Sequence, residues 1–179
     1  MFIMAVTPWA YRSGDEHVFL ERMGAVAPHR IFIPHIHEDD EYVTQLRDML
    51  NTRGREADVS AIDSTSPNNA HDPDYIMSDY IRRKVEWCEA IVVLVSPETQ
   101  GSDWVDKEIE LAKELGKAII GVYLPGAEGC PLPEGLADYA HAVVTYDEQQ
   151  ILGALDGAIN TISDGAGNTR PSTVVRHNC

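Results

Sequence analysis

The chain has 179 residues, and its 14 Lys and Arg against 29 Asp and Glu give a formal net charge of −15 at pH 7. This acidity disfavours binding to nucleic acid or to an anionic membrane surface, because both carry charge of the same sign. Hydrophobic residues make up 44% of the chain, which is typical of a domain that buries its own core. We therefore expect one globular domain with neither of these partners.

The three cysteines and the apolar start of the chain both argue for a cytoplasmic protein. Cys88, Cys130 and Cys179 are far apart and form no CxxC pair, so neither a disulfide framework nor a thiolate metal site is expected. Residues 1–10 are apolar but lack the basic segment that begins a signal peptide. No apolar run approaches the roughly 20 residues that span a membrane.

The first half of the chain alternates between strand and helix patterns. Residues 1–28 show no clear period, and we expect an N-terminal extension there. Residues 30–33 (R-I-F-I) predict a short strand, and a polar turn follows. Apolar residues then recur at helical spacing until Gly54. Residues 57–62 predict a second strand, and residues 63–74, rich in Ser, Pro, Asn and Asp, predict a long loop.

The second half continues the alternation. A helix near residue 81 precedes the continuous apolar run of residues 90–95, which is typical of a strand buried on both faces. We further predict helices at 103–115 and 151–162, strands at 118–124 and 142–146, a loop at 125–135 and a flexible tail at 163–179. Five alternations predict an α/β fold with a parallel central sheet of about five strands and helices on both faces.

Glu108 is out of place in the predicted helix 103–115. With Trp104 at 0° and about 100° per residue, Glu108 falls at about 40°, inside the apolar stripe. Its neighbours one turn away are Trp104, Val105, Leu111 and Ala112, so no cation on the helix pairs with it. A carboxylate on a buried face is costly unless it is paired or bonded, and desolvation raises its pKa. Glu108 is therefore a candidate acid, base or cation-stabilising group, or else a structural Glu bonded to the 63–79 loop.

Several motifs resemble one family. The strand 91–95 is followed by S-D-W-V-D-K-E-I at 102–109 and by G-K-A-I-I-G at 116–121. The chain also carries I-F-I-P-H at 31–35 and Asp72-Pro73. Over roughly residues 29–162 this pattern resembles TIR-like domains, above all the small stand-alone TIR-like proteins of the bacterial Thoeris anti-phage system. In that family a Trp stands four residues before the catalytic Glu.

The resemblance implies a flavodoxin-like fold and an NAD+ glycohydrolase or ADP-ribosyl cyclase, with NAD+ as substrate and no bound cofactor. The product would be a cyclic ADP-ribose isomer or an ADP-ribose conjugate. It would act as a diffusible second messenger that reaches a separate effector in anti-phage defence. The resemblance also suggests a site completed by homo-oligomer assembly. One departure is Pro34, where Ser is usual, because proline removes a backbone donor and a hydroxyl.

The expected site combines Glu108 with residues near the carboxyl ends of the strands. Glu108 is the candidate catalytic residue, since a carboxylate beside the ribose stabilises the positive charge that develops when the nicotinamide–ribose bond breaks. Trp104 would pack on nicotinamide or ribose, or serve as a core aromatic residue. The remaining candidates for substrate binding are loop residues: Pro34, His35, Asp39, Ser66 and Asp72.

The sequence also allows three other interpretations. A metal site built from His35, His37, His71 and Asp72 lacks characteristic ligand spacing, and we expect no metal. Nucleoside deoxyribosyltransferases share the layered fold, place a Glu after a central strand and also break an N-glycosidic bond. A non-catalytic TIR signalling or scaffold module is the third alternative, but a scaffold has no need for a carboxylate in the apolar stripe.

Overall fold

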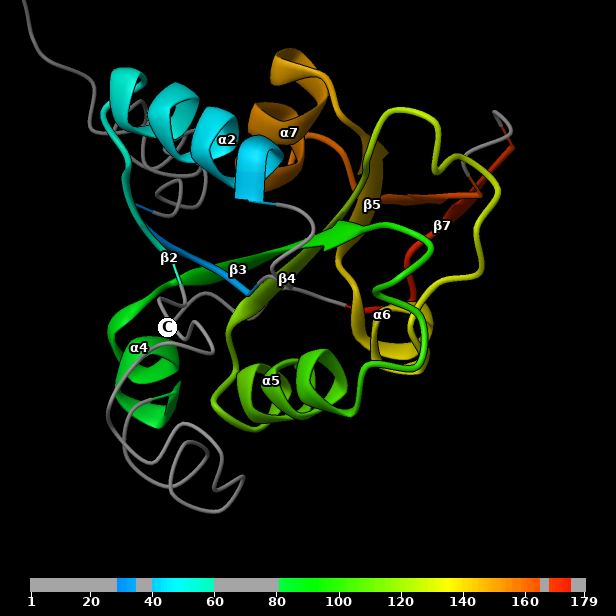
Figure 1. Cartoon of the computed structure of the whole chain (residues 1–179), viewed down its shortest axis with the longest axis horizontal. Coiled ribbons are helices and arrows are strands. Elements are labelled where there is room, and N and C mark those ends of the chain that lie inside the picture. The colour runs from blue at the N-terminus through cyan, green and yellow to red at the C-terminus, as the bar shows by residue number, and fades with distance from the viewer. Residues whose placement is uncertain (1–28, 35–39, 60–80, 165–167, 175–179) are drawn as a thin grey trace, which may run out of the picture.

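Residues 29–34, 40–59, 81–164 and 168–174 are described by the computed structural model, and they form one sheet with helices on both faces (Figure 1). In chain order the elements are β1 (Arg30–Ile33), α2 (Asp40–Thr52), β2 (Glu56–Val59), α4 (Ile81–Trp87), β3 (Ala90–Val95), α5 (Asp103–Glu114), β4 (Ala118–Tyr123), α6 (Glu134–Tyr139), β5 (Ala142–Thr145), α7 (Glu148–Leu155), β6 (Thr161–Ser163) and β7 (Thr169–Pro171).

The strand order is β2-β1-β3-β4-β5-β6-β7. The strands β1 to β6 pair in parallel, and β7 runs antiparallel to β6. The order of the first five strands is that of a flavodoxin-like fold, which confirms the predicted class. At the centre, β3 pairs with β4 from Ala90↔Ala118 to Val95↔Tyr123, and all six residues of β3 are buried.

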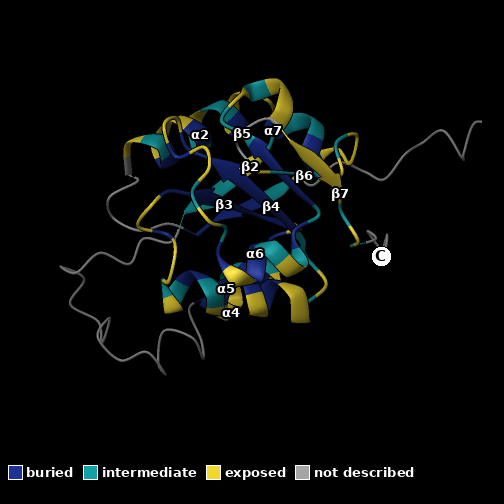
Figure 2. Ribbon diagram, turned by 90° about the vertical axis from the view of Figure 1, so that its right-hand side faces the viewer, coloured by how far each residue is buried: buried dark blue, intermediate teal, exposed yellow. Residues whose placement is uncertain are grey.

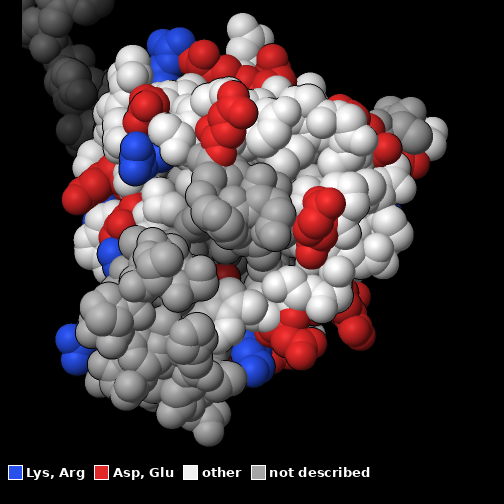
Figure 3. All heavy atoms as spheres, viewed as in Figure 1, with Lys and Arg blue, Asp and Glu red and all other residues white. Residues whose placement is uncertain are grey.

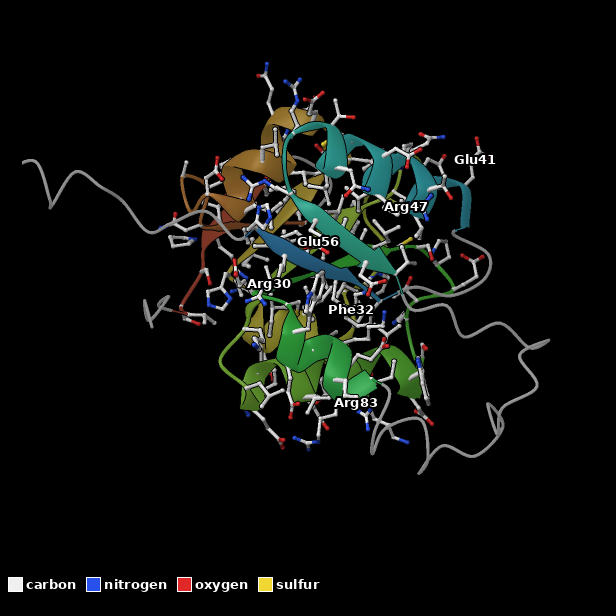
Figure 4. All side chains as sticks on the ribbon, turned by 90° about the vertical axis from the view of Figure 1, so that its left-hand side faces the viewer. Arg30, Phe32, Glu41, Arg47, Glu56 and Arg83 are labelled. Carbon is white, nitrogen blue, oxygen red and sulfur yellow. The ribbon has the colours of Figure 1, made fainter. Side chains whose placement is uncertain are left out.

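Helices cover both faces of the sheet, which explains the uninterrupted apolar runs in the central strands. The buried strands form a layer between α2 and α7 on one side and α4, α5 and α6 on the other (Figure 2). Strand β1 illustrates the alternation. Phe32 packs with the core beneath α4 and α5, whereas Ile31 and Ile33 pack beneath α2 (Figure 4).

The C-terminal part of the chain differs from the prediction. The sheet has seven strands instead of about five, and the expected helix 151–162 is instead α7, which starts at Glu148 and ends at Leu155. Asp147 caps its start by accepting a bond from the Gln150 amide at 3.0 Å. Gly157 has a φ of 75°, a left-handed conformation that helices cannot continue through. The released chain then forms β6.

Residues 169–171 also differ from the prediction, because a flexible tail was expected from residue 163 and these residues form β7. Contacts beyond β6 hold this segment in place. Arg170 Nη2 donates to the Ala137 carbonyl at 3.1 Å, and Ser172 Oγ donates to the Ala140 carbonyl at 2.8 Å. These bonds join the C-terminal strand to the end of α6. The expected loop 125–135 is likewise shortened, because α6 begins at Glu134.

Two residues of the G-K-A-I-I-G motif serve packing. Lys117 Nζ donates to the carbonyls of Glu86 and Cys88 at 3.0 and 2.8 Å, at the end of α4. A Cβ on Gly121 would lie 3.1 Å from a methyl of Val143 and 3.2 Å from one of Leu136. The motif therefore ties β4 to its neighbours on the face of the sheet that α5 covers.

Candidate functional site

The helix that carries the candidate Glu follows the central strand through a short, internally bonded turn. Ser96 and Thr99 are buried, and their hydroxyl oxygens lie 2.8 Å apart. Thr99 Oγ1 also donates to the Leu94 carbonyl at 3.1 Å, which ties the turn back to β3. Ser102 then caps α5 by accepting a bond from the Val105 amide. This turn fixes the first turns of α5 relative to the sheet.

Glu108 lies on the buried face of α5, as the helical periodicity predicted. Its exposed fraction is 0%, and it shares this face with Val105, Ile109 and Ala112. Neither carboxyl oxygen has a hydrogen-bond partner among the described residues. The Oδ1 atom of Asp106, on the same helix, is likewise buried without a partner in the described part of the chain. A carboxyl group in such surroundings is strongly penalised when it is charged.

Burial raises the pKa of Glu108 from 4.5 to about 8. The nearby Trp104 side chain acts in the opposite direction and lowers this pKa, although it makes no regular hydrogen bond with either oxygen. No described Lys or Arg forms an ion pair with Glu108. At neutral pH the group is therefore mostly protonated, and a cation brought next to it would favour its ionisation.

The topology places the start of α5 at a switch point of the sheet. The helix after β1, α2, covers one face of the sheet, and the helix after β3, α5, covers the other, although β1 and β3 are neighbours. In open α/β sheets such a switch point leaves a crevice beyond the carboxyl ends of the two strands, where ligands bind. Pro34 lies at this end of β1 and is buried. Ser96 lies at the corresponding end of β3.

Two of the six expected binding residues lie within the described part of the chain. Pro34 follows β1, and Trp104 lies one turn before Glu108. Trp104 is half-buried and packs against the core under α4 and α5. These contacts are those of a core aromatic residue, which is one of its two expected roles. The other four residues lie outside the described residues, namely His35, Asp39, Ser66 and Asp72. The 63–79 loop, expected as the alternative partner of Glu108, also lies outside the described residues.

Sequence reasoning missed the paired hydroxyl groups of Ser96 and Thr99. Ser-x-x-Thr at the end of a buried strand indicates a turn bonded through side chains, and this signal was available. Within the described ranges, no three His, Cys, Asp or Glu side chains are grouped closely enough to hold a metal ion. No helix there has the length and apolar character needed to cross a bilayer.

Solved structures with similar folds include three enzymes or enzyme-like proteins. A 2-deoxyribosyltransferase from Bacillus psychrosaccharolyticus has a TM-score of 0.50 and 12% identity, with 69% of this chain and 90% of that chain covered. The CMP N-glycosidase BcmB from Clostridium botulinum has a TM-score of 0.43 and 22% identity, with 71% and 98% covered. A 3-dehydroquinate dehydratase-like protein from Bifidobacterium longum has a TM-score of 0.40 and 14% identity, with 71% and 92% covered.

At 12% identity and a TM-score of 0.50, the likeness to the 2-deoxyribosyltransferase indicates the fold alone. No curated protein sequence matches the chain. A family model, described as the TIR-like domain of Thoeris protein ThsB, matches residues 32–129, which are more than half of the chain and include Trp104 and Glu108. The chain therefore belongs to the ThsB TIR-like domain family.

Proposed function

We propose that this protein is a TIR-like NAD+ glycohydrolase or ADP-ribosyl cyclase, with Glu108 as its catalytic residue. One observation carries the proposal: a carboxyl group at 0% exposure, with no described partner for either oxygen, on the helix that follows the central strand. A structural Glu at such a position is normally bonded or paired. Membership of the ThsB family supports the same assignment.

The chemistry of NAD+ suits a single carboxylate. Nicotinamide already carries a positive charge on its ring nitrogen, so it can leave without a proton from a general acid. Breaking its bond to ribose develops oxocarbenium character on the sugar. A carboxylate beside the ribose accepts hydrogen bonds from the sugar hydroxyls and stabilises the developing charge. We assign this role to Glu108, and Trp104 would pack on the nicotinamide or the ribose.

The raised pKa of about 8 fits a cationic substrate. In the unliganded protein Glu108 is mostly neutral at pH 7, and a bound pyridinium ring would lower its pKa and favour the carboxylate. Because Glu108 is 0% exposed, the ribose would reach it only after the covering residues move, and their closure would keep water away from the reacting sugar. This exclusion lets an internal nucleophile compete with hydrolysis, so that a cyclic ADP-ribose isomer or an ADP-ribose conjugate forms. A closing loop or a second copy of the chain would complete the cover.

The remaining parts of the proposal follow from the family. The loop residues Pro34, His35, Asp39, Ser66 and Asp72 would contact ribose or diphosphate. The product would diffuse in the cytoplasm and activate a separate effector during anti-phage defence.

The proposal is tested by measuring nicotinamide release from NAD+ with the purified full chain and with extracts of phage-infected cells that express it. Mass spectrometry would identify the nucleotide product. We expect Glu108→Gln, which keeps the shape but cannot ionise, to lower turnover by at least about 100-fold. Glu110→Gln is the matched control, since Glu110 is exposed on the same helix and should leave turnover unchanged.

Two results would overturn the assignment. Undiminished NAD+ cleavage by Glu108→Gln would remove the residue from catalysis. Exchange of free cytosine into 2′-deoxyadenosine without NAD+ cleavage would indicate a deoxyribosyltransferase, the second candidate, which is supported by the shared fold and by the Glu after a central strand. If Glu108→Gln loses both NAD+ cleavage and base exchange while Glu110→Gln keeps both, Glu108 is catalytic. Only the natural substrate would then need to be identified.

A further inference from the structure

A cavity lies near the β7 end of the sheet, and Glu108 does not line it. Its volume is about 470 Å³, within the range of small-molecule sites. Tyr123 ends β4 and Ser163 ends β6, and both line it, so the cavity opens at the carboxyl edge of the sheet. Most of its lining residues follow residue 129, where the family match ends, and Glu108 is not among them. The cavity is therefore a feature of the C-terminal part of this chain.

One side of the cavity is apolar. Pro131, Leu132 and Ile162 contribute hydrocarbon surface, and Ile162 is 5% exposed. The Tyr123 hydroxyl already donates to the Cys130 carbonyl at 3.2 Å, so this donor is occupied. Such a wall suits a flat, weakly polar ring, because contact with it removes apolar surface from water without leaving a polar group unpaired.

The other side is formed by residues 163–164 and 168–170, and its one cation is Arg170. Its Nη2 donates to the Ala137 carbonyl at 3.1 Å, which orients the guanidinium beside α6. Arginine has five N–H donors, and no described carboxylate pairs with this one. The lining acid, Asp164, is occupied: its oxygens accept from the Asn168 amide at 3.0 Å and from the Asn168 side chain at 2.8 Å.

Arg170 is an exposed arginine that pairs with no carboxylate in the described part of the chain, although the chain is acidic overall. On the face shown in Figure 3, acidic side chains are widespread and basic ones are few. Guanidinium groups bind phosphate through two parallel hydrogen bonds, and the lining carboxylate of Asp164 bonds to Asn168 and forms no described ion pair with Arg170. Thr169 adds a hydroxyl group beside Arg170, which can bond a sugar hydroxyl.

We propose that this cavity is a second ligand site that takes a molecule of nucleoside monophosphate size, with its phosphate on Arg170 and its ring against Leu132 and Ile162. The β7 segment, which lies beside α6 at the edge of the sheet away from β2, completes the site (Figures 1 and 2). The site is independent of Glu108 and of NAD+ cleavage, so either proposal can fail without the other.

The test uses the full chain, AMP as the probe, and adenosine and inorganic phosphate as its two parts. Amide NMR spectra locate binding, and calorimetry measures its strength. We expect saturable AMP binding below about 1 mM that shifts the amides of Gly129, Leu132 and Asn168, with each part binding more weakly than AMP. Arg170→Gln should weaken AMP binding at least about tenfold, whereas Arg82→Gln, an exposed arginine on α4, and Glu108→Gln should not.

Leu132→Trp provides a second variant, because it fills the cavity while keeping Arg170 and its bond to α6. It should also abolish the AMP-induced shifts. The proposal is overturned if AMP does not bind below about 1 mM, if binding survives both Arg170→Gln and Leu132→Trp, or if the shifts surround Trp104 and vanish in Glu108→Gln instead.

Discussion

Glu108 makes a testable contribution to stability as well as to the proposed chemistry. Its pKa is about 8 in the folded protein and near 4.5 when unfolded, so between these values the folded state holds a proton that the unfolded chain has released. The free energy of unfolding should therefore fall as the pH rises from about 4.5 to about 8, by at most about 1.4 kcal/mol per pH unit from this group. Urea titrations across this range measure the effect.

Glu108→Gln removes the titration and should gain stability relative to the native chain as the pH rises from 5 to 8. Below pH 4.5 the difference between the two proteins should become constant. Glu110→Gln, at an exposed position, should follow the native chain at every pH. Parallel curves for the native chain and Glu108→Gln would show that Glu108 is ionised and paired in the folded protein.

At the scale of residues, the sequence predicted burial best at positions that helical periodicity alone determines. The helical period of α5 alone placed Glu108 among apolar residues, and the structure confirms its burial. The surroundings of its oxygens could not be predicted, because they depend on other segments of the chain. Trp104 shows the same limit, since periodicity placed it on the buried face but could not separate core packing from substrate contact.

At the scale of elements, Lys117 shows how a family motif can serve the fold. Its ammonium group bonds to the Glu86 and Cys88 carbonyls, groups at the end of α4 that lack partners within the helix. We expect Lys117→Met to lower the free energy of unfolding by about 1–2 kcal/mol, since both carbonyls lose a charged donor. Urea denaturation would measure this loss.

Lys107→Met is the control for this prediction, because it removes the same charge from an exposed position and should change stability by less than about 0.5 kcal/mol. NAD+ cleavage by folded Lys117→Met should match that of the native chain. If Lys117→Met keeps native stability but loses NAD+ cleavage, Lys117 acts in the proposed active site and does not stabilise the fold.

The elements themselves were predicted best where they are long or buried. Strands β1 and β3 were predicted at their observed bounds, because each is a short apolar run whose ends are marked by polar turns. The helix α5 ended as expected before Gly116, whose φ is 67°. By contrast, β6 and β7 have three residues each, too few for a periodic pattern. Their pairing depends on contacts with α6 and β5 that no local signal reveals.

At the scale of the whole molecule, the C-terminal segment extends the sheet beyond the part that matches the family. Strand β7 covers the edge of β6, and Ser172 adds a bond from its amide to the Asn160 carbonyl at 2.9 Å. An uncovered edge strand exposes unpaired backbone groups and favours aggregation. We therefore expect the segment to contribute to stability as well as to the cavity beside α6.

A chain ending after Asp164 tests this contribution, because it loses β7 and the bonds of Arg170 and Ser172 to α6. Each lost bond is worth about 0.5–1.5 kcal/mol, so loss of the two bonds to α6 should lower the free energy of unfolding by about 1–3 kcal/mol in urea denaturation. A chain ending after Val174 keeps these contacts and should match the native protein. Since Glu108 and the family-matched residues precede the cut, the shortened chain should still cleave NAD+ when folded. If the chain ending after Asp164 is as stable as the native protein, β7 adds nothing to the stability of the fold. If that chain folds but no longer cleaves NAD+, the C-terminal segment is part of the active site.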